Sequence, residues 1–260
     1  MTTPLALLIG HVAGLLPAGL RVVGLAAVAP GLSYQQAPAQ TRVALAVSLA
    51  VVIAPVAATS PAPIDEPTAY IALCVVELAF GLALGFVTST VLEALRFGGE
   101  MLDLQIGLHA GQLFDPASGA HSGLLSTAYY MLALVFFVTL DGHHWLLRGI
   151  AESFAIVPVG GMTLGADFAA LVSKLGTSVL VLGLRIAGPV MVALLLADLA
   201  FGLVARAVPQ INVFLVGIPA KMALGFTIAA IGIPMVLMNV QRISEVMAAY
   251  MDATIRAFGG

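Results

Sequence analysis

The side chains best suited to chemistry gather in one short stretch, Asp141-Gly142-His143-His144. An aspartate and two histidines are common metal ligands, so this stretch must be weighed as a metal site. Adjacent residues of a helix point about 100° apart, which argues against His143 and His144 binding one ion. No cysteine or further histidine stands at ligand spacing nearby. We therefore expect no bound metal here, but a polar break at a membrane interface with Trp145 as its anchor.

Motifs for catalysis are absent from the sequence. It contains no nucleophile elbow, Walker loop, dinucleotide fingerprint or HExxH motif. We expect no enzymatic activity and no cofactor. A metal-dependent membrane enzyme that uses His143 and His144 is kept as a third hypothesis.

Three charged residues stand inside apolar stretches, where an ionisable side chain is costly and usually faces a partner. Arg185 and Asp198 are separated by roughly 20 Å along a helix, so they cannot pair with each other. We expect Arg185, Asp198 and Lys221 to be buried charges that contact another helix or another subunit. Broken helices around Arg185, Pro189 and Asp198 leave an alternative open, a secondary transporter with a site for a small solute or ion.

The elements that must position these residues are dictated by a very apolar composition. Of 260 residues, 61% are hydrophobic and only 9% are charged, and the mean hydropathy is +1.09. Soluble domains carry roughly a quarter charged residues, so disorder, a disulfide scaffold and an ordinary water-soluble enzyme are excluded. The net charge is −3 without a basic stripe, so we expect no nucleic-acid partner.

Apolar windows predict an all-α integral membrane protein with about six helices, because a segment in lipid must satisfy its own backbone hydrogen bonds. Two longer connections are expected, over about 96–123 and 141–174. Lys and Arg divide almost evenly between alternate loops and leave the orientation open. The apolar N-terminal segment lacks the pattern of a cleavable signal and is expected to remain. The predicted windows are 5–29, 43–64, 70–92, 124–140, 176–203 and 212–240.

Glycine and proline interrupt most of these windows. Gly81 and Gly85 share one helix face, and small residues there let two helix backbones approach closely. Proline removes a backbone donor and kinks a helix. The pattern is compatible with ordinary membrane helices, or with tilted and broken helices packed mainly against protein.

Taken in order, several motifs together resemble the FliR family of flagellar biosynthetic proteins over nearly the whole chain. The motifs that carry the resemblance are Arg21 to Pro30, Pro38 to Ala46, Gly107 with Phe114-Asp115-Pro116, Leu140 to His144 with Arg148 and Glu152-Ser-Phe154, Pro209 to Phe214, and Gly217 to Lys221. The Asp-Gly-His-His motif is similar to the flagellar rather than the injectisome branch of the family.

This resemblance implies a non-enzymatic subunit of the export gate of a type III secretion system, assembled with P-type and Q-type subunits. Its helices would form tilted, broken hairpins, with a P-like part at 1–175 and a Q-like hairpin and tail at 176–260. The expected location is the bacterial inner membrane at the flagellar basal body, with much of the protein above the bilayer plane. The residues implied for the hairpin tip are Pro209, Gln210, Asn212, Phe214 and Gly217.

The resemblance further implies that a loop at about 108–123 helps to close a channel for unfolded flagellar proteins. From the residues alone, the more economical hypothesis is that this segment simply connects two helices. Small and apolar side chains would dewet a constriction, which suits a plug. Other expected contacts are export-apparatus and basal-body components, unfolded substrates and membrane lipid. The plug candidates are Leu108, His109, Ala110, Gly111, Gln112, Leu113, Phe114, Asp115, Pro116 and Gly119.

Overall fold

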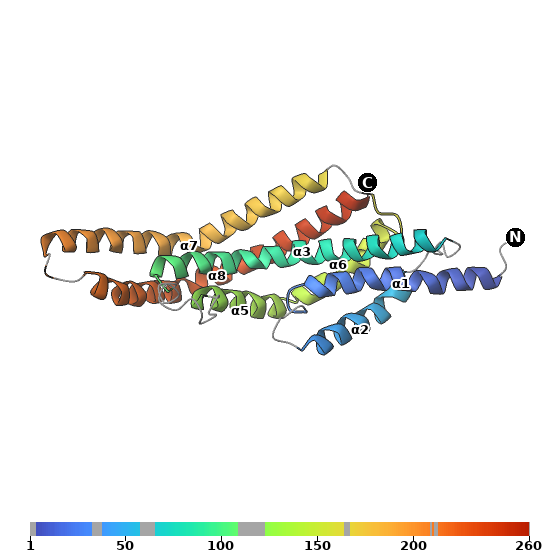
Figure 1. Ribbon diagram of the computed structural model, residues 1–260, viewed down its shortest axis with the longest axis horizontal. Coiled ribbons are helices and arrows are strands. Elements are labelled where there is room, and N and C mark those ends of the chain that lie inside the picture. Colours follow the sequence, from blue (N-terminus) through green and yellow to red (C-terminus); the bar gives the residue numbers. More distant parts are fainter. Residues whose placement is uncertain are drawn as a thin grey trace. The chain divides into compact units, whose positions relative to one another are not determined.

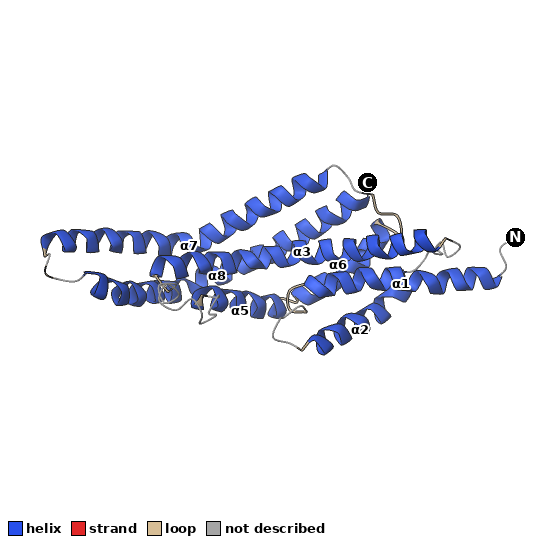
Figure 2. Cartoon of the chain, viewed as in Figure 1, coloured by secondary structure: helices blue, strands red, loops and turns tan. Residues whose placement is uncertain are grey.

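The computed structural model describes residues 4–32, 38–57, 66–108, 123–163, 167–208, 210 and 213–259, and every regular element in these ranges is an α-helix (Figure 2). The predicted all-α class is therefore confirmed. In chain order (Figure 1) the helices are α1 (Pro4–Val28), α2 (Ala39–Ala57), α3 (Pro67–Ile106), α5 (Leu124–Thr139), α6 (Gly142–Ile156), α7 (Asp167–Ala207) and α8 (Val213–Gly259).

Within the described ranges, three helical segments are long and apolar enough to cross a membrane: Pro67–Ile106, Phe168–Ala207 and Val216–Pro234. A fourth crossing is possible if α5 and α6, which meet at a bend of 68°, form one broken span. Ala13–Val28 of α1 and Ala39–Pro55 of α2 are further apolar helical segments. The described residues thus contain helices typical of a membrane protein.

Both long connections predicted from the sequence prove to be partly helical, which corrects that expectation. Helix α3 continues to Ile106 rather than ending near Arg96, and α6 occupies much of 141–174. The chain restarts as a helix at Gly142 because Asp141 adopts a left-handed conformation, with φ 57° and ψ 27°. Aspartate tolerates this conformation better than most side chains.

Contacts group the chain into two compact units. Unit 1 comprises Met1–Val91, Phe137–Gly176 and Ser244–Gly260, and unit 2 comprises Leu92–Phe136 and Thr177–Ile243. Helices α3, α7 and α8 each contribute to both units. This grouping concerns packing only, so the predicted likeness of 1–175 and 176–260 to two other subunit types stays a prediction.

In unit 1, α1 and α3 approach at backbone distance because both present glycine. A Cβ added to Gly24 would lie 2.5 Å from the carbonyl oxygen of Leu78, and one on Gly85 would lie 2.7 Å from that of Leu25. One on Gly81 would overlap the backbone of Arg21. Gly81 and Gly85 thus mediate the close approach that their spacing predicts.

A fully buried ion pair holds unit 1 together. Arg21 Nε lies 2.6 Å from Glu77 Oε2, and both side chains are 0% exposed. Arg21 also donates to the carbonyl oxygen of Val157 at 2.9 Å, and Glu77 Oε1 accepts from the backbone N–H of Gly160 at 2.8 Å. The guanidinium carbon lies 4.2 Å from the ring centroid of Phe154. The pair therefore joins α1, α3 and the turn after α6.

In unit 2, α7 and α8 run side by side as a hairpin (Figure 1), joined at their facing ends by the short segment around Gln210. Gly217 of α8 is buried and faces α7. A Cβ added to Gly217 would lie 3.9 Å from the ring of Phe201 in α7. Farther along, Lys221 Nζ lies 2.8 Å from Asp198 Oδ1. The hairpin is thus fixed by a small residue and an ion pair.

Candidate functional site

The carboxylate of Asp103, near the end of α3 in unit 2, binds the start of α5. Asp103 Oδ1 accepts a hydrogen bond from the backbone N–H of Leu125 at 3.0 Å, and Oδ2 accepts from that of Ser126 at 2.9 Å. Asp103 is 0% exposed. The first N–H groups of a helix lack partners within the helix and favour negative charge, so a carboxylate from another helix caps α5.

The backbone of Asp103 also ends α3. Its carbonyl oxygen accepts from the N–H of Gly107 at 3.2 Å and from that of Leu108 at 3.0 Å. Gly107 has φ +87°, a left-handed conformation typical of a helix C-terminus. Asp103 therefore binds both residues that lead into segment 109–122 and residues that follow it. We call Asp103, Gly107, Gly123 and Ser126 the loop anchor.

Close backbone contact reinforces the loop anchor. A Cβ added to Gly123 would overlap the Asp103 carboxylate, and one added to Gly99 would lie 2.5 Å from Ser126 Cα. Glycine at these two positions lets α3 and the start of α5 meet closely enough for the carboxylate to reach the backbone N–H groups. The two ends of segment 108–123 are thus held at one place.

The same end of α3 contacts the α7–α8 hairpin. Gln105 Nε2 donates to Asp198 Oδ2 at 3.3 Å, and Lys221 Nζ donates to the same oxygen at 3.0 Å. A Cβ on Gly225 would lie 2.5 Å from Ile106 Cδ1, so the backbone of α8 passes close to the last residue of α3. The end of α3 that carries the loop anchor therefore contacts the hairpin directly within unit 2.

Most predicted plug residues fall outside the described ranges. Leu108 is described and lies half-buried in the turn that follows α3. The loop anchor flanks this segment, and its role as a plug stays a prediction. The candidates outside the described ranges are His109, Ala110, Gly111, Gln112, Leu113, Phe114, Asp115, Pro116 and Gly119.

The structure describes only some of the residues predicted for the hairpin tip, between α7 and α8. Gln210 is an exposed turn residue and Gly217 is buried in α8. Pro209 and Asn212 lie outside the described residues, and Phe214 is within α8 with a side chain that is not described. The role of the hairpin tip in assembly stays a prediction.

All three isolated charges lie within the described residues. Asp198 does contact a charge on another helix, Lys221, and the two side chains are 42% and 18% exposed. Arg185 lies on an exposed face of α7. Within the chain itself, none of these three side chains is fully buried. Burial between subunits stays a prediction.

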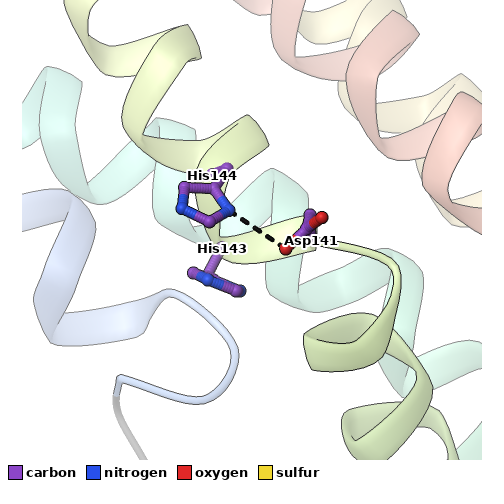
Figure 3. A group of neighbouring side chains, drawn as sticks. All are labelled: Asp141, His143 and His144. Atoms are coloured by element: carbon purple, nitrogen blue, oxygen red, sulfur yellow. Dashed lines mark hydrogen bonds and ion pairs between the residues drawn. The ribbon is translucent and has the colours of Figure 1, made fainter.

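The Asp141–His143–His144 group lies at the bend between α5 and α6 (Figure 3). His144 Nδ1 is 3.1 Å from Asp141 Oδ1, and the two imidazole centroids are 4.2 Å apart. One ligand atom from each residue lies within 4.8 Å of the others. The geometric reason for expecting these side chains to diverge is therefore wrong, because Asp141 precedes the helix and both rings lean to the same side.

An apolar cavity of about 250 Å³ opens in unit 2 beside Pro189. Its lining includes Tyr129 and Ile228, but neither Arg185 nor Asp198. Ion and solute sites need convergent polar groups, so this cavity lends no support to the transporter hypothesis.

Sequence reasoning missed two sets of residues. Arg21 and Glu77 are single charges in apolar windows, and the cost of burying either charge alone could have suggested the pair. In the sequence, Asp103 stands at helical spacing from Arg96 and Glu100, which indicates at most charge pairs along one helix. Nothing local indicates that its carboxylate caps a helix that starts 21 positions later, at Leu124, beyond an intervening loop.

Comparison with known proteins gives consistent relatives. A family model described as bacterial export proteins, family 1, matches residues 12–247. The flagellar biosynthetic protein FliR of Escherichia coli (strain K12) is 33% identical over 217 residues, which cover 84% of this chain and 83% of that protein. The FliR proteins of Bacillus subtilis (strain 168) and Caulobacter vibrioides are 32% and 30% identical, and cover 86% and 82% of this chain and 87% and 85% of their own length.

Proposed function

Because this chain belongs to family 1 of the bacterial export proteins, with the FliR flagellar biosynthetic proteins as relatives, it is a subunit of the flagellar export apparatus, and we propose that its segment 108–123 helps to close the export channel. Export-gate subunits of this kind have a transport role. The chain would conduct unfolded flagellar proteins past this segment and carry out no chemistry on them.

The loop anchor is the observation that supports the proposal. A plug must move without detaching, so its two ends need a firm common attachment. Asp103 provides one by binding Leu125 and Ser126 through its side chain, and Gly107 and Leu108 through its carbonyl oxygen. Loops whose ends are close together behave as compact units and are frequently functional.

The composition of the segment suits a closure that excludes ions. Between the two anchored ends stand Ala110, Gly111, Leu113 and Phe114, with few charges. A narrow ring of apolar side chains dewets and blocks ions, and it opens when a polypeptide displaces it. The glycines allow the displaced segment to take other backbone conformations.

Exposed apolar side chains on α7 support a position among neighbouring subunits or lipid. Leu196, Leu199 and Leu203 are 61%, 67% and 70% exposed in the isolated chain. Contiguous apolar surface of this kind marks an interaction site or a membrane-facing surface. We assign it to P-type and Q-type export-gate subunits and to lipid of the bacterial inner membrane at the flagellar basal body.

A deletion of residues 113–119 tests the proposal. The complexes should still assemble, because the loop anchor is retained, but the membrane should leak small ions. Leakage is measured as ion flux in vesicles that contain the purified export gate. A deletion of equal length at 59–65, in the Pro-rich segment between α2 and α3, is the matched control and should leave the membrane tight.

Phe114→Asp gives a second measurement that keeps the loop length unchanged. A charge in the constriction should hydrate it and raise single-channel conductance. Assembled complexes that stay tight after the 113–119 deletion and keep their conductance with Phe114→Asp would remove segment 108–123 from the pore.

A further inference from the structure

We propose that Asp141, His143 and His144 bind one divalent transition-metal ion of the zinc class at the bend between α5 and α6. The group offers two imidazole nitrogens and one carboxylate oxygen, the ligand set that suits Zn²⁺ and its neighbours Co²⁺, Ni²⁺ and Cu²⁺. With both imidazoles neutral, the site carries one negative charge, which favours a divalent cation.

The distances are close to those that a metal ion requires. Ligand atoms around a tetrahedral Zn²⁺ stand about 3.4 Å apart, given metal–ligand distances of about 2.1 Å. His144 Nδ1 and Asp141 Oδ1 are already 3.1 Å apart, and all three ligand atoms lie within 4.8 Å of one another. Side-chain rotations that shorten the longest of these separations by at most about 1.4 Å would complete the site.

The backbone of the bend brings the three side chains together. Asp141 has a left-handed conformation and its carbonyl oxygen accepts from the N–H of His144 at 2.9 Å, which turns the chain into α6. A Cβ on Gly142 would lie 2.7 Å from the carbonyl oxygen of Phe137, so only glycine permits this tight turn. The ligands thus belong to one rigid turn.

A second observation points to a cation. His143 Nδ1 is shielded from solvent and has no hydrogen-bond partner among the described residues. An imidazole nitrogen without a partner is left unsatisfied, and a metal ion bound at this nitrogen would satisfy it. Asp141 and His144, by contrast, have side chains that are 72% and 67% exposed, so an ion can enter from solvent.

The ion would fix the bend rather than catalyse a reaction. It would link Asp141, the residue before α6, to the first turn of that helix. Three protein ligands leave a fourth coordination position for water or for a side chain of a neighbouring subunit. Loss of the ion should therefore loosen the 68° bend between α5 and α6 without unfolding either helix.

Metal binding is measured on the export-gate complex, purified from membranes through a tag that contains no histidine. The complex is stripped with a chelator, dialysed against buffered Zn²⁺, and its zinc content per copy of this chain is determined by mass spectrometry. The wild type should bind one ion more than a His143→Gln/His144→Gln variant. Asp141→Asn, which still tolerates the left-handed conformation, should weaken binding at least tenfold.

Asp252→Asn is the matched control, because this exposed carboxylate pairs with Arg256 of α8 and does not belong to the group, and it should leave the zinc content unchanged. Cu²⁺ loading provides a structural readout, since its electron paramagnetic resonance spectrum should report two coordinated nitrogens, and one after His144→Gln. Equal zinc content in the wild type and the double variant would overturn the proposal, as would a copper site with a single nitrogen ligand. His144→Gln alone suffices if the double variant does not assemble, because His144 is exposed.

Discussion

At the scale of the residue, the Arg21–Glu77 pair shows how this chain tolerates charge in an apolar interior. Two oppositely charged groups that are both 0% exposed are acceptable only when each is paired and hydrogen-bonded. Val157 and Gly160 supply the additional backbone partners. Removal of one member leaves the other buried and unpaired, so the cost exceeds the value of the pair itself.

Glu77→Gln should therefore destabilise the protein strongly, by about 3–5 kcal/mol. The measurement is the thermal midpoint of the detergent-solubilised complex. Glu93→Gln is the matched control on the same helix: its partner Arg96 lies 3.2 Å away, but the two side chains are 42% and 40% exposed. Exposed pairs contribute at most about 1 kcal/mol, so Glu93→Gln should barely change the midpoint. Equal effects would mean that burial of the pair is not what stabilises unit 1.

At the scale of the element, glycines determine how closely the helices pack. Gly98 and Gly99 of α3 face two different neighbours in unit 2. A Cβ on Gly98 would lie 3.0 Å from the carbonyl oxygen of Gly183 in α7, and one on Gly99 would meet the backbone of Ser126 in α5. A helix that carries two adjacent glycines can contact two helices at backbone distance, which the loop anchor requires.

Gly99→Ala should shift α5 away from α3 and weaken the Asp103 cap, at a cost of about 1–3 kcal/mol. Amide hydrogen exchange at Leu125 and Ser126 should accelerate, and this is the measurement. Gly202→Ala is the control: nothing lies within 4 Å of its added Cβ, and alanine favours a helix over glycine by about 1 kcal/mol. Unchanged exchange in Gly99→Ala would show that this contact does not position the cap.

At the scale of the whole molecule, the chain exposes more apolar surface than a monomer in water tolerates. Val52, Ile231 and Leu203 are 70%, 73% and 70% exposed, and they stand on three different helices. Soluble monomers rarely expose contiguous apolar patches of more than a few hundred Å². The chain therefore needs lipid or other subunits to cover these faces, as its family membership implies.

Affinity purification from native membranes should recover this chain together with P-type and Q-type subunits, identified by mass spectrometry. Expressed without them, it should yield less folded protein, because its apolar faces stay uncovered. A peripheral apparatus protein that is expressed to a similar level serves as the control for unspecific recovery. A folded chain that is isolated alone and moves a solute across vesicles unaided would instead support the transporter hypothesis.

Local patterns in the sequence predicted much of this protein. The apolar windows predicted membrane helices, the spacing of Gly81 and Gly85 predicted a close helix contact, and the order of the motifs predicted the family. These are properties of single segments, and periodicity along one segment determines which element forms. Helix ends were less predictable, since α3 continues to Ile106 and α6 begins directly after Asp141.

Only the tertiary structure decided which side chains meet. Asp103 caps α5, Lys221 pairs with Asp198, and the rings of His143 and His144 lean together beside Asp141. Each contact depends on which faces of two helices come together, or on one left-handed residue at a bend. A shift of one residue turns a helical side chain by about 100°. Small changes in helix length or bend therefore decide these contacts. The sequence of a single segment does not predict such contacts between segments.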